Sequence, residues 1–446
     1  MANLKIEKVE VTDIRFPTSL EGHGSDAMHT DPDYSCAYVT IHLSKTDLKG
    51  YGLTFTCGRG TEIVVQAVKT MSYLVEGENC HDIWNDFAGF YRKLTSESQL
   101  RWVGPEKGVV HLATGAIINA LWDVWARYEN KPLWKLLVDL SPEKLVSTID
   151  FRYIRDVLSP EECISMLKEK GKEQADREKE ICTTGYPAYT TSVGWLGYTD
   201  DNIKKLCQEY LDKGFTSFKV KVGQCLEDDK RRCNMVRSAI GPKNNLMIDA
   251  NQRWEVPEAI EWVTALKEYK PLWIEEPTSP DDVLGHATIA KALRPLGINV
   301  ATGEMCQNRV IFKQLLQSNA IAYAQIDSCR VGGVNENLSI YFMCKKFGVP
   351  VCPHAGGVGL CELVQHLQFW DYLSLSGEKE NRMIEWVDHL HEHFVTPITV
   401  INGKYIAPKV PGFSSEMKEE SIAYYQFPKG TYWENRANPD HIMLAQ

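Results

Sequence analysis

Three short segments set the rhythm of this chain: TSFKVK at 216–221, NLMID at 245–249 and PLWIE at 271–275. Each is apolar and rich in strand-forming residues, each ends in a charged residue, and helix-forming sequence separates one from the next. The same arrangement continues in both directions along the chain. It gives eight segments, which end at Ser192, Lys221, Asp249, Glu275, Glu304, Asp327, His354 and Glu385.

The spacing of these ends predicts the fold. Consecutive ends lie 23 to 31 residues apart, about the length that a strand, a helix and two loops require. Eight such units build a closed β/α barrel, in which the residues at the C-terminal strand ends meet at one mouth. An open doubly wound sheet is the alternative, but it gives no reason for eight polar strand ends in register.

The flanking regions follow other patterns. Residues 6–15 and 35–43 alternate as strands do, the loop EGHGSDAMHTDPDY at 21–34 joins them, and residues 61–137 change to a helical period. This first third predicts a separate α+β domain. The barrel rhythm ends after Glu385, and we expect the remaining chain to return to the first domain. The predicted divisions are 1–145, 146–390 and 391–446.

Composition excludes several classes of protein. The 446 residues are 43 % hydrophobic and 24 % charged with a formal net charge of −10, which argues against a nucleic-acid binder. No apolar run reaches the roughly 18 residues of a membrane span. Thirteen scattered cysteines without a C-x-x-C pair are typical of free thiols in a reducing compartment. With no targeting segment visible, we expect an intracellular protein of the cytosol or the mitochondrial matrix.

Three consecutive strand ends carry carboxylates, at Asp249, Glu275 and Glu304. Neighbouring barrel strands point into one mouth, so we expect these side chains to converge. Three crowded anions repel one another unless a cation lies between them. An all-oxygen ligand set favours a hard ion, most simply Mg²⁺, which keeps positions for water and substrate. A single strand-end carboxylate would more simply be solvated or capping.

Lys219 and Lys221 lie two residues apart on one predicted strand, so both side chains point to the same side. Lysines inside a barrel are unfavourable unless they meet charge or take part in chemistry. Two neighbouring ammonium groups near a dication lower each other's pKa, so we expect a lysine that can act as a base near neutral pH. An edge strand with two exposed lysines is the alternative.

Asp327 and His354 follow neighbouring strands, on the other side of the mouth from the lysines. An Asp that holds one imidazole nitrogen fixes the tautomer and leaves the other nitrogen as a general acid or base. The AGGVG after His354 allows main chain and substrate to approach closely. Glu385 completes the ring, either as a hydrogen-bonding acid or as a solvated carboxylate.

The order Lys-x-Lys, Asp, Glu, Glu, Asp, His, Glu along successive strands resembles the mandelate-racemase branch of the enolase superfamily. Longer stretches are similar to the L-fuconate dehydratases of that branch, including GHGSDAMHTDPDYS at 22–35, MIDANQRW at 247–254, WIEEPTSPDD at 273–282 and CPHAGGVGLCELVQHL at 352–367. The resemblance implies an α/β fold, a (β/α)7β TIM-like barrel with an N-terminal α+β capping domain that the C-terminal segment completes.

The resemblance also implies a reaction. L-fuconate would lose the proton next to its carboxylate and then its 3-hydroxyl, giving 2-keto-3-deoxy-L-fuconate and water. Asp249, Glu275 and Glu304 would hold Mg²⁺, which would bind the substrate carboxylate. The remaining implied roles are Lys221 as base, Lys219 as partner of a carboxylate oxygen, His354 held by Asp327 as acid, and Glu385 as hydrogen-bond donor. The implied substrate-binding residues are Gly24, Ser25, Asp26, Tyr34, Lys219 and Asn251.

Other functions stay open at this point. Another acid-sugar dehydratase, or a racemase or epimerase, would keep the fold and change the substrate or the reaction. A glycoside hydrolase would use two of the carboxylates, and the lysine pair argues against it. A non-catalytic binding scaffold would not need a complete set of polar strand ends. The expected partner is a small-molecule acid sugar, with neither nucleic acid nor membrane, and a homo-oligomer is left open.

Overall fold

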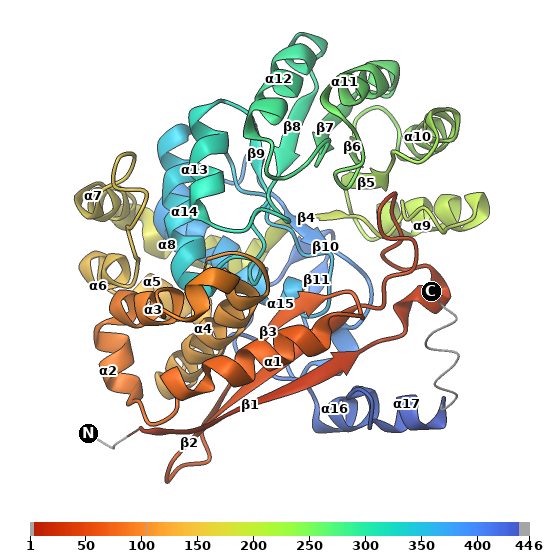
Figure 1. Cartoon of the computed structure of the whole chain (residues 1–446). Coiled ribbons are helices and arrows are strands. Elements are labelled where there is room, and N and C mark those ends of the chain that lie inside the picture. Colours follow the sequence, from red (N-terminus) through yellow and green to blue (C-terminus); the bar gives the residue numbers. More distant parts are fainter. Residues whose placement is uncertain (1–3, 105, 437–446) are drawn as a thin grey trace.

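The N-terminal part of the protein is a three-stranded antiparallel sheet covered by helices (Figure 1). The computed structural model describes residues 4–104 and 106–436, so 1–3, 105 and 437–446 of the predicted divisions lie outside it. The strands, in the order β1-β2-β3, are β1 (Ile6–Arg15), β2 (Ser35–Leu43) and β3 (Lys49–Thr56). The helices are α1 (Thr61–Met71), α2 (Cys80–Asn85), α3 (Phe87–Thr95), α4 (Gly108–Tyr128), α5 (Leu133–Asp139) and α6 (Pro142–Ser147).

Helix α4 joins this cap to the rest of the protein. It packs against β3 and also against α14 (Gly333–Phe347). A Cβ on Gly52 of β3 would lie 2.2 Å from the main-chain oxygen of Ala116, so only glycine permits this close approach. By length and mean hydropathy α4 could cross a membrane, but 89 % of its apolar window is buried inside the protein. The apolar character of α4 therefore reflects its place as a central helix of the hydrophobic core.

The second part is the predicted barrel. Strands β4 (Tyr186–Thr190), β5 (Ser217–Lys221), β6 (Asn245–Asp249), β7 (Pro271–Glu275), β8 (Asn299–Thr302) and β9 (Tyr323–Ala324) pair in parallel in chain order. The last strand, β10 (Ile384–Trp386), pairs with β4 and closes the ring. The outer helices are α7 (Pro160–Lys170), α8 (Gln174–Thr184), α9 (Asp200–Asp212), α10 (Leu226–Ile240), α11 (Val256–Ala265), α12 (Val283–Leu293), α13 (Arg309–Gln317), α14 and α15 (Leu360–Trp370).

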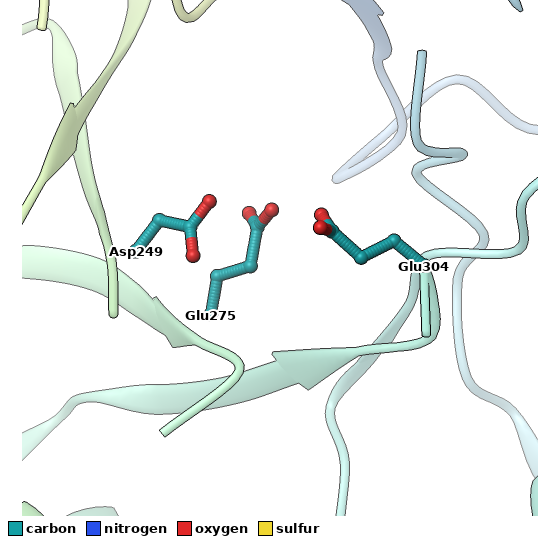
Figure 2. A group of neighbouring side chains, drawn as sticks. All are labelled: Asp249, Glu275 and Glu304. Carbon is teal, nitrogen blue, oxygen red and sulfur yellow. The ribbon is translucent and has the colours of Figure 1, made fainter. Parts of the chain in front are cut away.

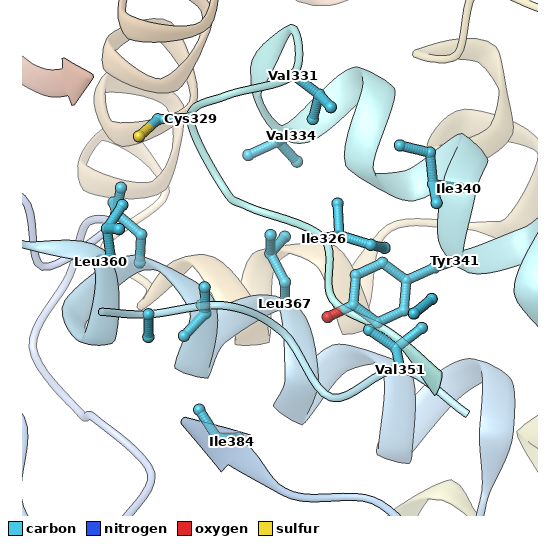
Figure 3. Close-up of a cluster of buried hydrophobic side chains, with 14 of the residues drawn as sticks. Ile326, Cys329, Val331, Val334, Ile340, Tyr341, Val351, Leu360, Leu367 and Ile384 are labelled. Carbon is cyan, nitrogen blue, oxygen red and sulfur yellow. The ribbon is translucent and has the colours of Figure 1, made fainter. Parts of the chain in front are cut away.

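The seventh barrel position departs from the predicted strand. The segment before His354 pairs with the chain around β9 through two isolated bridges, Ala324 to Val351 and Asp327 to His354. Pro350 and Pro353 flank this segment, and proline has no N–H to give to a regular ladder. Apolar side chains hold the segment in place, since Val351 lies in the buried cluster of Figure 3.

The C-terminal segment first touches the barrel and then the cap. Strands β11 (Val400–Ile401) and β12 (Lys404–Tyr405) form a hairpin that pairs with β4. Helices α16 (Glu419–Tyr425) and α17 (Thr431–Asn435) follow, and the amide of Phe427 between them donates to the carbonyl of Asp13 in β1 at 2.8 Å. The fold is thus a TIM-like barrel whose N-terminal cap is completed by the C-terminal segment.

Candidate active site

Three carboxylates point toward one another at the mouth of the barrel (Figure 2). Asp249 ends β6, Glu275 ends β7, and Glu304 follows β8 by two residues. Each offers one oxygen, and these oxygens lie within 4.8 Å of one another. Asp249 and Glu275 are fully buried, while the Glu304 side chain is 13 % exposed. The structure therefore brings together the three residues that the sequence predicts as metal ligands.

Negative charge is in excess around these carboxylates. Burial and the Asp249 charge raise the pKa of Glu275 although Lys219 lies beside it. Burial and the neighbouring carboxylates also raise the pKa of Glu276, the next residue along the chain. In the described part of the chain no group donates a hydrogen bond to the Glu304 carboxylate. A hard dication would neutralise this excess through oxygen ligands, so the donor set fits Mg²⁺.

Lys219 and Lys221 project from β5 into this cluster. The Nζ of Lys219 lies 2.5 Å from Glu275 Oε1 and 2.8 Å from Glu385 Oε1. The Nζ of Lys221 lies 2.6 Å from Asp249 Oδ2. The protein's own carboxylates raise the pKa of each lysine. The lowering expected beside a dication stays a prediction. Burial disfavours both ammonium groups, but the surrounding carboxylates outweigh burial and the repulsion between the lysines.

His354 and Asp327 form the predicted pair. The His354 Nδ1 lies 2.8 Å from Asp327 Oδ2, and its Nε2 lies 3.6 Å from Glu304 Oε2. Burial disfavours the imidazolium, but Glu304 and Asp327 outweigh burial and raise the pKa of His354 to about 9. A Cβ on Gly356 would lie 3.2 Å from Nε2, so glycine keeps this nitrogen accessible. The histidine is placed as a proton donor toward the pocket.

Glu385 lies on β10 and acts as an acceptor. Its Oε2 accepts the amide of Ala355 at 2.8 Å, its Oε1 lies beside Lys219, and the hydroxyl of Thr191 donates to it. Burial opposes the charge, but Lys219 and His354 outweigh it and lower the pKa of Glu385. The family resemblance implies a hydrogen-bond donor to the substrate here. Toward the protein's own groups Glu385 is an acceptor, and its role toward a substrate stays a prediction.

The loop between β1 and β2 lies over the mouth. Gly24, Asp26 and Tyr34 line the same pocket as the catalytic candidates, as the sequence predicts. Ser25 is not among the residues that line it. Its hydroxyl accepts the amide of Gly197 at 2.9 Å, and this bond ties the loop to the barrel. The structure therefore gives Ser25 an anchoring role, and its contact with a substrate stays a prediction.

The Asp26 carboxylate is occupied within its own loop. Its Oδ1 accepts the amides of Met28 and His29, each at 2.7 Å, and its Oδ2 lies 3.1 Å from the Nδ1 of His29. His29 itself lines the pocket, and Asp26 raises its pKa. Sequence reasoning missed this imidazole, although a histidine three residues after an aspartate is the pattern that could have found it.

Further pocket residues follow the polar strand ends by a few positions. Trp195, Arg330 and the predicted Asn251 line the pocket. The side-chain oxygen of Asn251 accepts Lys221 Nζ at 2.9 Å, and the Trp195 ring centroid lies 5.4 Å from that same nitrogen. Trp195 and Arg330 each lie three residues after a polar strand end. The pattern of strand ends does not include them, but a search of the first residues of each following loop would have found them.

Comparison with known proteins matches both parts of the chain. Residues 202–421 match the family described as "Enolase C-terminal domain-like". Residues 21–138 match "Mandelate racemase / muconate lactonizing enzyme, N-terminal domain".

Individual relatives match over nearly the full length. The crystal structure of human mitochondrial enolase superfamily member 1 has a TM-score of 0.97 at 60 % identity, covering 98 % of this chain and 99 % of that one. L-galactonate dehydratase of Hypocrea jecorina is 50 % identical over 97 % of both chains. L-talarate/galactarate dehydratase from Salmonella typhimurium LT2, liganded with Mg and L-lyxarohydroxamate, has a TM-score of 0.74 at 24 % identity over 96 % and 94 % of the two chains, a likeness of fold.

Proposed function

Because this chain belongs to the enolase superfamily, in its mandelate racemase and muconate lactonizing enzyme branch, we propose that it is a Mg²⁺-dependent acid-sugar dehydratase. One observation carries the proposal: Lys221 and His354 line a single pocket together with Glu304 of the carboxylate cluster. The substrate we propose is L-fuconate, which loses water to give 2-keto-3-deoxy-L-fuconate. The carboxylate set alone would fit many metal enzymes, but a base and an acid beside it fit an elimination.

The metal site of the proposal consists of Asp249, Glu275 and Glu304. Mg²⁺ takes oxygen ligands and retains open positions, which suits three carboxylates and a substrate oxygen. When bound, the ion supplies positive charge that stabilises the substrate carboxylate as negative charge moves onto it, and that lowers the pKa of the nearby lysines.

The chain's own residues move the protons. Neutral Lys221 takes the proton from C2, while its hydrogen bond to Asn251 and its contact with Asp249 fix the position of Nζ. Lys219 pairs with an oxygen of the substrate carboxylate. His354, whose pKa Asp327 and the nearby carboxylates raise, gives its proton to the 3-hydroxyl as the C3–O bond breaks. Water leaves, and the resulting enol tautomerises to the 2-keto acid.

A second substrate has support of its own. The Hypocrea jecorina relative is named for L-galactonate, and L-fuconate is the 6-deoxy form of that acid. The two acids therefore differ only at C6, where one has a methyl group and the other a hydroxymethyl group. Phe55, Leu112 and Pro32 line the pocket and favour the methyl group, whereas Arg330 and His29 offer donors for a hydroxyl.

A direct assay tests the proposal. Each acid is incubated with the protein and Mg²⁺, and the 2-keto acid product is measured as kcat/KM. We expect both acids to be dehydrated, L-fuconate with the higher kcat/KM, and activity to disappear after EDTA treatment and return with Mg²⁺. Undiminished turnover after exhaustive metal removal would contradict the metal site, and formation of a 2-keto acid only from other acid sugars would contradict the substrate.

The racemase alternative is separated by isotope. Lys221 and His354 could exchange protons on opposite faces of C2, which would give the C2 epimer without loss of water. In D₂O a racemase yields labelled epimer, whereas the proposed dehydratase yields a 2-keto acid. The human relative is named a mitochondrial protein, which favours the matrix over the cytosol as the compartment we propose.

A further inference from the structure

A second cavity lies at the end of the barrel opposite the active site. The parallel strands β6 and β7 begin there, at Asn245 and Pro271, and both of these residues line it. Its volume is about 440 Å³, within the size range of small-molecule sites. We call it the basal pocket. It shares no lining residue with the active-site pocket.

Positive charge is concentrated in the basal pocket. Arg237, Lys243, Lys267 and Lys270 line it, and no carboxylate does so in the described part of the chain. The three lysines are exposed, and none of them forms an ion pair within the described ranges. Four uncompensated cations in one cavity stand out in a chain whose net charge is −10, because they create a local field of the opposite sign.

Arg237 uses its hydrogen bonds on main chain rather than on an acid. Its guanidinium donates to the carbonyls of Tyr269 at 3.0 Å, Gly241 at 2.9 Å and Asn244 at 2.7 Å. Carbonyl oxygens accept these bonds without cancelling the charge, and burial lowers the pKa of Arg237. By contrast, the buried Arg309 pairs with Glu336 at 2.9 Å. Arg237 therefore adds positive charge to the pocket, while its N–H groups hold the main chain.

The same arginine fixes the lysine-bearing turn. It also donates to the carbonyl of Lys270, whose backbone is left-handed at φ 49°. Gly297, at φ 73°, forms an open wall of the pocket, since a Cβ there would meet no atom within 4 Å. Beside it, Leu296 offers an apolar side chain that is 39 % exposed. The cavity thus combines one held arginine, three exposed lysines, a reachable main chain and one apolar surface.

We propose that the basal pocket binds a small soluble organic phosphate with at least two negative charges. The phosphate oxygens contact Lys243, Lys267 and Lys270, and the organic part packs against Leu296. A phosphate fits better than an acid sugar, because a single carboxylate cannot satisfy three ammonium groups. A pocket confined to this end of the barrel also fits a small ligand better than a nucleic-acid duplex or a membrane, which need an extended basic surface.

Calorimetric titration of the full-length protein with ADP, using adenosine as the uncharged control, tests the proposal. We expect ADP to bind, to weaken as salt is added, and to bind at least about tenfold more tightly than adenosine. The double variant K267E/K270E should weaken ADP binding by about tenfold or more. The matched variant K204E/K205E, two exposed lysines of α9, should leave it within about twofold. Thermal unfolding of both variants checks that they are folded.

Three results would overturn the proposal. The first is no ADP binding to the wild-type protein, and the second is equal weakening by the two charge-reversal pairs. The third is displacement of ADP by L-fuconate, which would locate ADP in the active site. Phosphatidylserine vesicles form a separate arm. If the vesicles bind with the K267E/K270E dependence and ADP does not bind, the ligand is a lipid headgroup and the soluble phosphate is excluded.

Discussion

Glu304 at the barrel mouth and Glu336 beneath the cap are the same residue type in opposite surroundings. Both oxygens of Glu336 are occupied, by Arg309 at 2.9 Å and by the His111 ring at 2.7 Å, and the amide of Gly332 donates at 2.6 Å. Burial opposes its charge, but His111 and Arg309 outweigh burial and lower its pKa. No described residue donates a hydrogen bond to the Glu304 carboxylate, and the cationic group nearest to that carboxylate is His354 at 3.6 Å.

The difference separates structural charge from functional charge. A buried carboxylate whose oxygens all accept hydrogen bonds from the protein is part of a complete internal network, and it stabilises the fold. A carboxylate surrounded by other carboxylates has no such partner, and it contributes only when something else binds. The same comparison distinguishes Arg309, which meets Glu336, from Arg237 in the basal pocket, which meets only main-chain carbonyls.

The largest expected effect is at Lys221. If the mouth serves chemistry rather than stability, K221A should lower kcat for L-fuconate by about 10²–10⁴-fold, the usual contribution of a general base. Asp249 keeps Lys219 at 3.3 Å, so the fold should persist. Dehydration kinetics and C2 exchange in D₂O measure the loss, with the exposed Lys8 variant K8A as control. A near-normal kcat would reassign the base.

Glu336 should show the reverse behaviour. E336Q removes the anion from beside buried Arg309 and should destabilise the protein by about 3 kcal/mol, since breaking a buried pair leaves an uncompensated charge. Because its folded pKa is lowered, this stability is present above the unfolded pKa of about 4.3 and is lost as the pH falls below it.

Tm measured from pH 7 to pH 3.5 tests this pair of statements. The gap between wild type and E336Q should be widest at neutral pH and should begin to narrow below about pH 4.3, where Glu336 of the unfolded chain takes up a proton while folded Glu336 stays ionised. A gap that is constant with pH would show that shape, and not charge, makes Glu336 structural.

The same substitution at the mouth sharpens the contrast. E304Q should weaken Mg²⁺ binding by about a hundredfold, since even indirect partners of a metal ligand contribute 10–100-fold. The Tm of the metal-free protein should stay close to wild type, because no described residue donates a hydrogen bond to the Glu304 carboxylate. Metal titration followed by calorimetry gives the first quantity and thermal unfolding in EDTA the second. A Tm drop as large as that of E336Q would erase the distinction.

The sequence predicts the framework of this site well because two simple regularities fix it. A period of 23 to 31 residues specifies parallel strands, and a polar residue closing each strand specifies what meets at the mouth. Asp249, Glu275, Glu304, Lys221 and His354 follow from that rule alone. Their chemical roles remain proposals.

What the sequence does not predict depends on local geometry and on charge balance. The prolines around Val351 break a ladder that apolar patterning alone leaves intact. The close approach of Asp249 to Lys221 Nζ, which raises the pKa of Lys221, is a distance that spacing cannot give. Asp26 has a carboxylate of the kind that binds a substrate hydroxyl, but this carboxylate accepts hydrogen bonds from the amides of the turn that follows it.

The smallest expected effect concerns His29, the imidazole that Asp26 holds over the pocket. H29A should raise KM for L-fuconate by about two- to tenfold with little change in kcat, the usual net contribution of one hydrogen bond. D26A should act in the same direction, because Asp26 reaches the substrate through His29. The double variant D26A/H29A should then be no worse than the poorer single variant, since two residues acting as one unit are not additive. Steady-state kinetics of the four proteins measure the cycle. Additive effects on KM would show that Asp26 contacts the substrate independently, and a wild-type KM in H29A would remove the cap loop from substrate recognition.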